Sequence, residues 1–256
     1  MAIASPFDPA AGDLRGRVAV ITGASRGLGA GMAARFAEAG LLLGLCARSV
    51  PDAPAGHAGS TWCRSVDVAD AGQVERFAAE VVERFGPIDC WVNNAGVLEP
   101  IGPQRDHDPA DVARALAVNI GGVANGTRTF TRSARTWPAR RRLLANISSG
   151  ASRSVYEGWS IYGATKAAVD HLTEIVAAEE PGVVCRSVAP GVVDTEMQAL
   201  IRTQDPEHFP AVDRFHEISR AGAWNSPAWV ADHLLAMLAG TSTDPDVVVR
   251  VPAEPR

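Results

Sequence analysis

A phenol and an ammonium group are spaced in this chain so that they can act together. Tyr162 and Lys166 lie four residues apart, and on an α-helix that spacing puts both side chains on one face. A phenol with a pKa near 10 is a weak acid at neutral pH, but a neighbouring cation favours the phenolate and lowers that pKa. The pair therefore suits proton transfer to or from a substrate oxygen.

A third polar group, Ser149, precedes the pair in the sequence. It follows the apolar run Leu143 to Ser148, which is typical of a buried strand. Ser149 is therefore expected at the carboxyl end of a strand, where open α/β sheets bind their ligands. A Tyr-x-x-x-Lys spacing also occurs by chance on exposed helices, so the catalytic interpretation needs support from the rest of the chain.

That support comes from a glycine-rich turn near the N-terminus. The apolar run Val18 to Ile21 is followed at once by Thr22 to Gly29 and then by a helical pattern through Ala39. Glycines permit a tight turn and a close approach of the backbone, so that free N–H groups and a helix N-terminus can face a pyrophosphate. The alternative is a tight turn without a ligand, but strand, glycine turn and helix together are the context that dinucleotide binding requires.

The end of the next strand bears on the choice of cofactor. Leu41 to Ala47 reads as a buried strand, and Arg48 stands where an acid would hold the 2′-hydroxyl of NAD. Arg26 adds a second cation in the glycine turn. The absent acid and the two arginines favour NADP(H) over NAD(H), although Arg48 alone is also compatible with a solvated side chain.

The remaining apolar patterns alternate between strands and helices. Further strands are expected at 62–66, 88–92, 143–148, 183–188 and 247–249, and helices at 73–84, 111–135, 162–180 and 227–238. This alternation predicts a Rossmann-type, doubly wound α/β fold with a parallel seven-stranded sheet and helices on both faces. The expected organisation is a loose tail over residues 1–15, one domain over 16–256, and a mobile polar flap outside the core over 195–220.

Composition excludes several classes of function. The net charge of −5, from 24 Lys and Arg against 29 Asp and Glu, argues against a nucleic-acid partner. The longest dense apolar run, Leu41 to Ala47, is too short to cross a bilayer, and Met1 to Leu14 lacks the pattern of a signal peptide. The cysteines are isolated from one another, which predicts reduced thiols and a cytoplasmic protein. The six histidines show no metal-ligand spacing, so no metal is expected.

Taken together, the motifs resemble the short-chain dehydrogenase/reductase family along nearly the whole chain. They occur in the family's order: Thr22 to Gly29, Asn93-Asn94-Ala95-Gly96, Asn119, Ser149, Tyr162 with Lys166, and Pro190-Gly191.

The resemblance implies a role for each catalytic candidate. Tyr162 would protonate the carbonyl oxygen of a substrate as hydride arrives, and Ser149 would hold that oxygen by a hydrogen bond. Lys166 would bind the nicotinamide ribose and lower the pKa of Tyr162. Asn119 would hold a water molecule that completes the proton relay. That water would also be the hydrogen-bond partner that the Asn119 side chain needs in the middle of a helix.

The resemblance also implies cofactor contacts along the chain. Asp67 and Val68 would meet the adenine, and Val193 with Thr195 the carboxamide end of the nicotinamide. The full set of implied contacts is Gly23, Ser25, Arg26, Gly27, Leu28, Gly29, Arg48, Asp67, Val68, Asn94, Ala95, Gly96, Tyr162, Lys166, Pro190, Gly191, Val193 and Thr195.

A narrower resemblance, to sepiapterin reductases and microbial benzil (diketone) reductases, is visible in the stretches 94–100, 158–162, 179–181 and 191–198. Sepiapterin reductases carry an acid near the C-terminus that anchors the pterin, and here only Asp246 or Glu254 is a candidate. Trp159, Trp224 and Met197 are candidates for an apolar pocket, although such residues are more often core. A diketone or another activated ketone is therefore the favoured substrate.

The sequence thus predicts an NADPH-dependent carbonyl reductase. The alternatives are a pterin ketone reductase, an NAD-dependent alcohol dehydrogenase, and a sensor that binds the dinucleotide without turnover. The family usually pairs through its two long helices, here 111–135 and 162–180, so a homodimer or homotetramer is expected.

Overall fold

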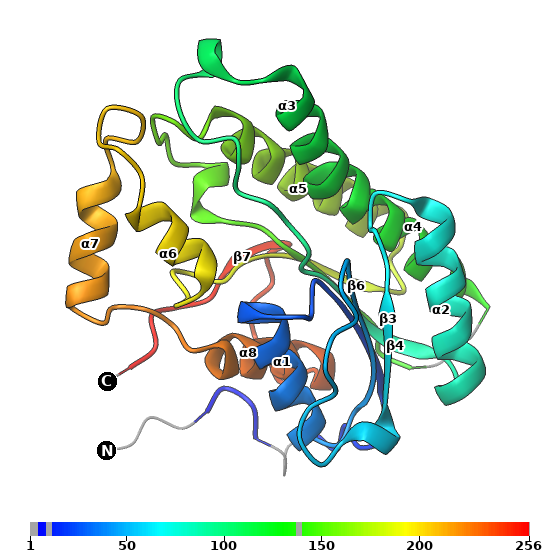
Figure 1. Ribbon diagram of the computed structural model, residues 1–256. Helices are drawn as coiled ribbons and strands as arrows, with labels where there is room; N and C mark the ends of the chain where they lie inside the picture. Colours follow the sequence, from blue (N-terminus) through cyan, green and yellow to red (C-terminus); the bar gives the residue numbers. More distant parts are fainter. Residues whose placement is uncertain (1–4, 9–11, 137–139, 256) are drawn as a thin grey trace.

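The computed structural model describes residues 5–8, 12–136 and 140–255. These residues form one parallel sheet of seven strands in the order β3-β2-β1-β4-β5-β6-β7 (Figure 1). The strands are β1 (Val18–Thr22), β2 (Leu42–Ala47), β3 (Thr61–Ser65), β4 (Ile88–Asn93), β5 (Leu143–Ile147), β6 (Val184–Ala189) and β7 (Val248–Arg250). The predicted Rossmann-type fold is confirmed.

Helices cover both faces of the sheet and give it two hydrophobic cores. Ala19 and Ile21 of β1 belong to the core that holds buried residues of α1 and α8, whereas Val18 and Val20 belong to the core that contains residues of α2 and α4. Successive residues of a strand point to opposite faces, so a strand buried on both sides is apolar throughout. The helices are α1 (Gly27–Glu38), α2 (Ala71–Phe85), α3 (Pro109–Leu116), α4 (Gly122–Arg135), α5 (Ser160–Glu179), α6 (Glu196–Arg202), α7 (Val212–Arg220) and α8 (Pro227–Ala239).

The predicted helix over 111–135 is two helices joined by a π-helical turn. Asp108 caps the start of α3 by accepting a hydrogen bond from the backbone N–H of Ala110, and Pro109 occupies the first helical position. The turn Ala117–Gly121 then separates α3 from α4 and contains the fully buried Asn119. Such turns arise often at functional sites, and the apolar periodicity that predicts a helix carries no signal for them.

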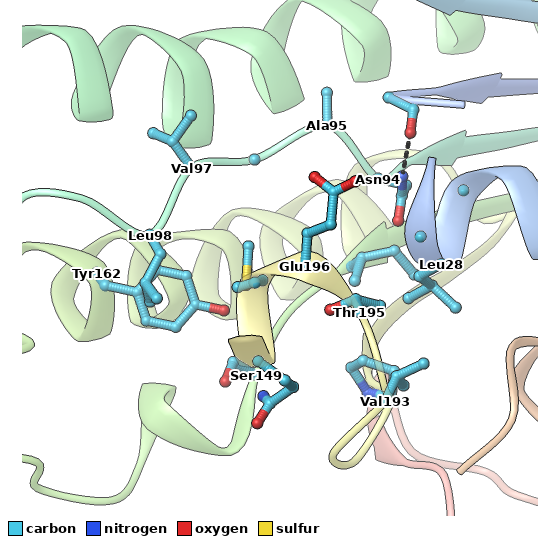
Figure 2. Close-up of a pocket in the computed structure, with 18 of the residues that line it drawn as sticks. Leu28, Asn94, Ala95, Val97, Leu98, Ser149, Tyr162, Val193, Thr195 and Glu196 are labelled. Carbon is cyan, nitrogen blue, oxygen red and sulfur yellow. Dashed lines mark hydrogen bonds between the residues drawn. The ribbon is translucent and has the colours of Figure 1, made fainter. Parts of the chain in front are cut away.

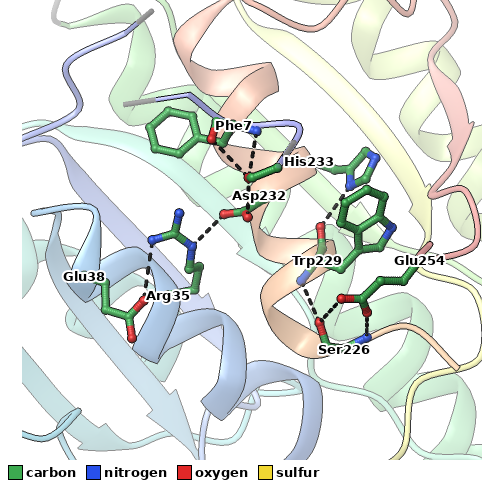
Figure 3. A network of polar contacts seen from close by, with 9 residues as sticks. Phe7, Arg35, Glu38, Ser226, Trp229, Asp232, His233 and Glu254 are labelled. Atoms are coloured by element: carbon green, nitrogen blue, oxygen red, sulfur yellow. Dashed lines mark hydrogen bonds and ion pairs between the residues drawn. The ribbon is translucent and has the colours of Figure 1, made fainter. Parts of the chain in front are cut away.

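The N-terminal segment is not a loose tail where the structure describes it. Phe7 and Leu14 are each only 2% exposed and belong to the same core as α1 and α8. The Ser5 hydroxyl donates to the buried carboxylate of Asp232 on α8, which also accepts a hydrogen bond from Arg35 of α1 (Figure 3). The prediction of a loose tail over 1–15 therefore does not hold at Phe7 and Leu14, and residues 1–4 and 9–11 lie outside the described residues.

The segment 195–220 contains two short helices, α6 and α7, and it is not excluded from the core. Ile201 of α6, Phe209, and Val212 and Phe215 of α7 are buried in a third hydrophobic cluster, together with Trp159 and Tyr162. The composition of the segment does not predict this apolar face, because many polar residues lie between the buried ones. Whether the flap moves stays a prediction.

No helix in the part of the chain that the structure describes combines the length and the apolar character needed to span a membrane.

The packing of Phe7 predicts a measurable loss of stability. Phe7→Ala should lower the free energy of unfolding by about 3 kcal/mol, because the truncation leaves a cavity in a close-packed core. Val155→Ala is a suitable control because Val155 is 96% exposed. Urea unfolding followed by circular dichroism measures both variants, and equal stabilities would contradict the burial of Phe7.

Candidate active site

A cavity of about 1200 Å³ lies where the carboxyl ends of the strands meet α6 and α7 (Figure 2). Its lining includes every predicted cofactor residue, from Gly23 in the glycine turn to Thr195 before α6, and also Ser149. Asn119 is the one predicted site residue that does not line it. The fold therefore brings groups from nearly the whole chain to one edge of the sheet.

The glycine turn leaves room for a ligand because side chains are absent from it. Gly23 has φ of +67°, and a Cβ there would lie 2.7 Å from the Cα of Ala95. A Cβ at Gly29 would collide with the carbonyl oxygen of Gly23 and lie 2.6 Å from Nδ2 of Asn94. The turn thus brings bare backbone and the start of α1 to the cavity, which is the arrangement that binds a pyrophosphate. The residues present fit a nicotinamide dinucleotide.

Asn94 holds this turn in place. Its side-chain amide donates to the carbonyl oxygens of Thr22, at 2.9 Å, and Gly23, at 3.1 Å, and its backbone N–H donates to the Thr22 hydroxyl. These bonds join the end of β4 to the end of β1. The amide nitrogen of Asn94 is therefore committed to positioning the turn.

Arg48 lies at the end of the cavity that holds Asp67 and Val68, whereas Arg26 lies in the glycine turn at the start of α1. Arg48 follows β2, its carbonyl oxygen accepts from the Ser65 hydroxyl, and its guanidinium has no ion-pair partner within the described ranges. Arg26 forms an ion pair with Glu196, the first residue of α6. An acid at the end of β2 is absent, as the sequence shows.

The three polar groups that the sequence singled out meet at the other end of the cavity. Ser149 follows β5, and its Oγ caps a short 3₁₀ helix by accepting from the backbone N–H of Ala151 at 3.2 Å. Tyr162 and Lys166 lie on α5, with Nζ of Lys166 5.6 Å from the centroid of the Tyr162 ring. Nζ also donates to the carbonyl oxygen of Ile147, the last residue of β5, at 2.8 Å.

Burial shifts the pKa of both titratable groups. It raises the pKa of the Tyr162 phenol above its ordinary value, against a smaller opposing effect of a hydrogen bond with Ser149. Burial lowers the pKa of Lys166 to about 8, and the carboxylate of Asp170 partly opposes that change. The expected lowering of the Tyr162 pKa is not seen, because desolvation of the phenolate dominates.

Asp170 is a residue that the sequence reasoning missed. It is buried on α5 one turn beyond Lys166, and it accepts a hydrogen bond of 2.6 Å from the Ser187 hydroxyl on β6. The sequence does contain a signal for Asp170. It follows Lys166 by four residues, as Lys166 follows Tyr162, so the three side chains share one helix face. Asp170 supplies the negative charge that favours the ammonium form of Lys166.

The side chain of Asn119 has a different partner from the one expected. Its Oδ1 accepts from the backbone N–H of Val97, and its Nδ2 donates to the carbonyl oxygen of Val97, both at 2.8 Å. Nδ2 also lies 3.2 Å from the Thr165 hydroxyl. The expectation that a water molecule satisfies this side chain is wrong, because protein groups already do so; a water held elsewhere on Asn119 stays a prediction.

The wall beyond Tyr162 is apolar and comes largely from the flap. Trp159 stacks on Phe209 with ring centroids 4.6 Å apart and meets the edge of Tyr162 at 5.5 Å. Residues of this wall that line the cavity are Leu98, Trp159, Met197, Leu200 and Phe215. Two of the three predicted pocket residues, Trp159 and Met197, are thus in place, whereas Trp224 is not among the lining residues.

Neither candidate for a pterin-anchoring acid reaches the cavity. The Glu254 carboxylate accepts from the backbone N–H and hydroxyl of Ser226 at the start of α8 (Figure 3). Asp246 also lies outside the lining, whereas Arg250 of β7 is part of it. The C-terminal segment therefore places a cation at the cavity, whereas the pterin ketone alternative requires an acid there.

The cysteines match the prediction of reduced thiols. All four are free, and Cys46, Cys90 and Cys185 are buried. Within the described ranges, no group of three or more His, Cys, Asp or Glu side chains is arranged to hold a metal ion.

Comparison with known proteins agrees with this geometry. The chain is 30% identical over 247 residues to a benzil reductase ((S)-benzoin forming) of Bacillus cereus, which covers 92% of this chain and 99% of that protein. It is 36% identical over 217 residues to a sepiapterin reductase of Meriones unguiculatus, covering 77% and 82% of the two chains. The crystal structure of the KRED1-Pglu enzyme matches with a TM-score of 0.77 at 32% identity, over 91% of this chain and 100% of that one.

Both branches that the sequence motifs suggested are therefore represented among its relatives. The family model described as short chain dehydrogenase matches residues 17–206, which include the glycine turn, Ser149, Tyr162 and Lys166. The chain belongs to the short-chain dehydrogenase family.

Proposed function

We propose that this protein is an NADPH-dependent carbonyl reductase that reduces a ketone or 1,2-diketone with Tyr162 as the general acid. One observation carries the proposal: a single cavity is lined by a glycine turn that carries Arg26, by Arg48 after β2, and by Ser149, Tyr162 and Lys166 beside an apolar wall. The similarity to a protein named benzil reductase supports the substrate class.

The chemistry divides between cofactor and protein. A reduced nicotinamide dinucleotide supplies the hydride that adds to the carbonyl carbon. Ser149 and Tyr162 hold the carbonyl oxygen between them, and Tyr162 gives its phenolic proton to that oxygen as the alcohol forms. Lys166 stabilises the phenolate that remains, because its ammonium group lies on the same helix face.

The protonation state of Tyr162 fits the proposed role. A Tyr162 pKa raised by burial keeps the phenol protonated at neutral pH, as a general acid requires. Arg48 at the end of β2, where an acid would hold the 2′-hydroxyl of NAD, counts against the NAD-dependent alcohol dehydrogenase alternative. The presence of Ser149, Tyr162 and Lys166 together counts against a sensor without turnover, and the distant Glu254 counts against a pterin ketone.

The setting of the enzyme is also a proposal. The free, buried cysteines support a reducing compartment such as the cytoplasm. The homodimer or homotetramer is proposed from the resemblance to the family, which usually pairs through the two long helices, here 111–135 and 162–180.

Benzil reduction tests the reaction directly. Purified protein with NADPH should consume the reduced cofactor when benzil is added, and Tyr162→Phe should lower kcat by about 10²- to 10⁴-fold because the acid is lost. The loss of NADPH absorbance measures the rate, and NADPH fluorescence checks that the variant still binds the cofactor. No turnover by wild-type protein that binds NADPH tightly would contradict the diketone assignment.

Arg48 tests the cofactor preference. Arg48→Asp removes a cation for the 2′-phosphate and places an acid for the 2′-hydroxyl, so the ratio of kcat/KM for NADPH to that for NADH should fall by at least about tenfold. Arg76→Asp on α2 makes the same change of charge outside the cavity and is the matched control. If this ratio of kcat/KM values is unchanged in Arg48→Asp, Arg48 does not bind the 2′-phosphate.

The Lys166 pKa predicts a pH dependence. The value of kcat/KM for NADPH, which reports the free enzyme, should fall as the pH rises above about 8, because Lys166 then loses the charge that attracts the cofactor. Lys166 is the only lysine in the sequence, so lysine labelled with ¹⁵N gives one side-chain signal whose titration can be followed by NMR. A profile that stays flat to pH 9.5 would contradict this role.

A further inference from the structure

An ion pair joins the glycine turn to the flap across the cavity. Arg26, at the start of α1, pairs through its guanidinium with the carboxylate of Glu196, the first residue of α6, and both residues line the cavity. Figure 2 shows Glu196 extending from the start of α6 over this space. The two residues are 170 positions apart in sequence, so no local pattern relates them.

A second contact fixes the same two segments side by side. Thr195, which precedes Glu196, packs on the glycine turn so closely that a Cβ at Gly27 would lie 3.3 Å from its Cγ2. The φ of +55° at Gly27 shows that the turn itself is bent there. The flap thus meets the turn at Gly27, and the neighbouring Arg26 meets Glu196.

The two arginines predicted to bind the cofactor differ in whether their guanidinium groups already have an ion-pair partner. The Arg48 guanidinium has no ion-pair partner within the described ranges, whereas that of Arg26 is neutralised by Glu196. A phosphate group that binds Arg26 must therefore replace a carboxylate. Both side chains of the pair are 69% exposed, and exposed ion pairs contribute little, so a dianionic phosphate can displace Glu196.

We propose that Glu196 is a specificity-determining residue that competes with the cofactor 2′-phosphate for Arg26. The inference rests on the proposed function in one respect, that Arg26 reads the 2′-phosphate. Glu196 then weakens binding of NADP(H) and leaves binding of NAD(H) unchanged, because a dinucleotide with a free 2′-hydroxyl has no 2′-phosphate to compete for Arg26. When the phosphate takes Arg26, the flap keeps the Thr195 contact and loses the ion pair.

Half-cofactors test this without any turnover. Adenosine 2′,5′-bisphosphate carries the 2′-phosphate and adenosine 5′-monophosphate lacks it, and isothermal titration calorimetry gives both dissociation constants. Glu196→Gln should tighten binding of the bisphosphate by about two- to fivefold, the range set by the small strength of exposed ion pairs, and leave the monophosphate unchanged. Asp194→Asn removes the same charge two residues away, outside the cavity lining, and should change neither.

A double-mutant cycle identifies Arg26 as the route of the effect. In the Arg26→Gln background, Glu196→Gln should no longer tighten binding of the bisphosphate, because the guanidinium for which Glu196 and the 2′-phosphate compete is absent. The proposal would be overturned if the tightening persisted in that background or extended equally to the monophosphate. Glu196 would then act only as a negative charge that repels any phosphate. Unchanged or weaker binding in Glu196→Gln would overturn it as well.

Failure of the proposed cofactor preference gives a different result. In that case wild-type protein would bind the bisphosphate no more tightly than the monophosphate, and Arg26→Gln would weaken neither. If Arg26→Gln selectively weakens the bisphosphate while Glu196→Gln has no effect, the preference for NADP(H) stands and the role of Glu196 alone is refuted.

Discussion

The candidate site depends on burying one ammonium group. Lys166 is the only lysine in the sequence, and all its other Lys or Arg residues are arginines. A buried charge is costly unless hydrogen bonds and an opposite charge compensate it. Here the carbonyl oxygen of Ile147 and the carboxylate of Asp170 do so, and they require β5, α5 and β6 to keep their register. Arginine is not an equivalent replacement, because its larger planar guanidinium places its donors differently from a compact ammonium group.

The sequence predicted those parts of the fold whose signals are local. Strands buried on both faces give continuous apolar runs, and the spacing of Tyr162 and Lys166 follows from helix geometry. The glycine turn was recognisable because Gly23 and Gly29 stand where side chains would fill the backbone cradle. These features need no knowledge of what the chain packs against.

The rest of the structure depends on contacts between distant segments. Phe7 stands in a segment without apolar period, so nothing local shows that it enters the core. Asn119 was flagged as needing a partner, but its partner is the backbone of Val97, which no side-chain pattern reveals. The flap was assigned to the surface because the segment as a whole is polar and contains Pro206 and Pro210. Only tertiary packing brings Phe209 and Phe215 together in a buried cluster.

The stack of Trp159 on Phe209 links the pocket wall to the proposed acid, because the Tyr162 ring lies against the same tryptophan. Phe209 lies behind this wall, so replacing it by a smaller residue would remove the surface that supports Trp159 and so loosen the neighbour of Tyr162. Met197 and Leu200 line the cavity but are only partly buried against this cluster, so they can change with less disturbance. Divergence toward new substrates would accordingly begin on α6 and reach the aromatic stack last.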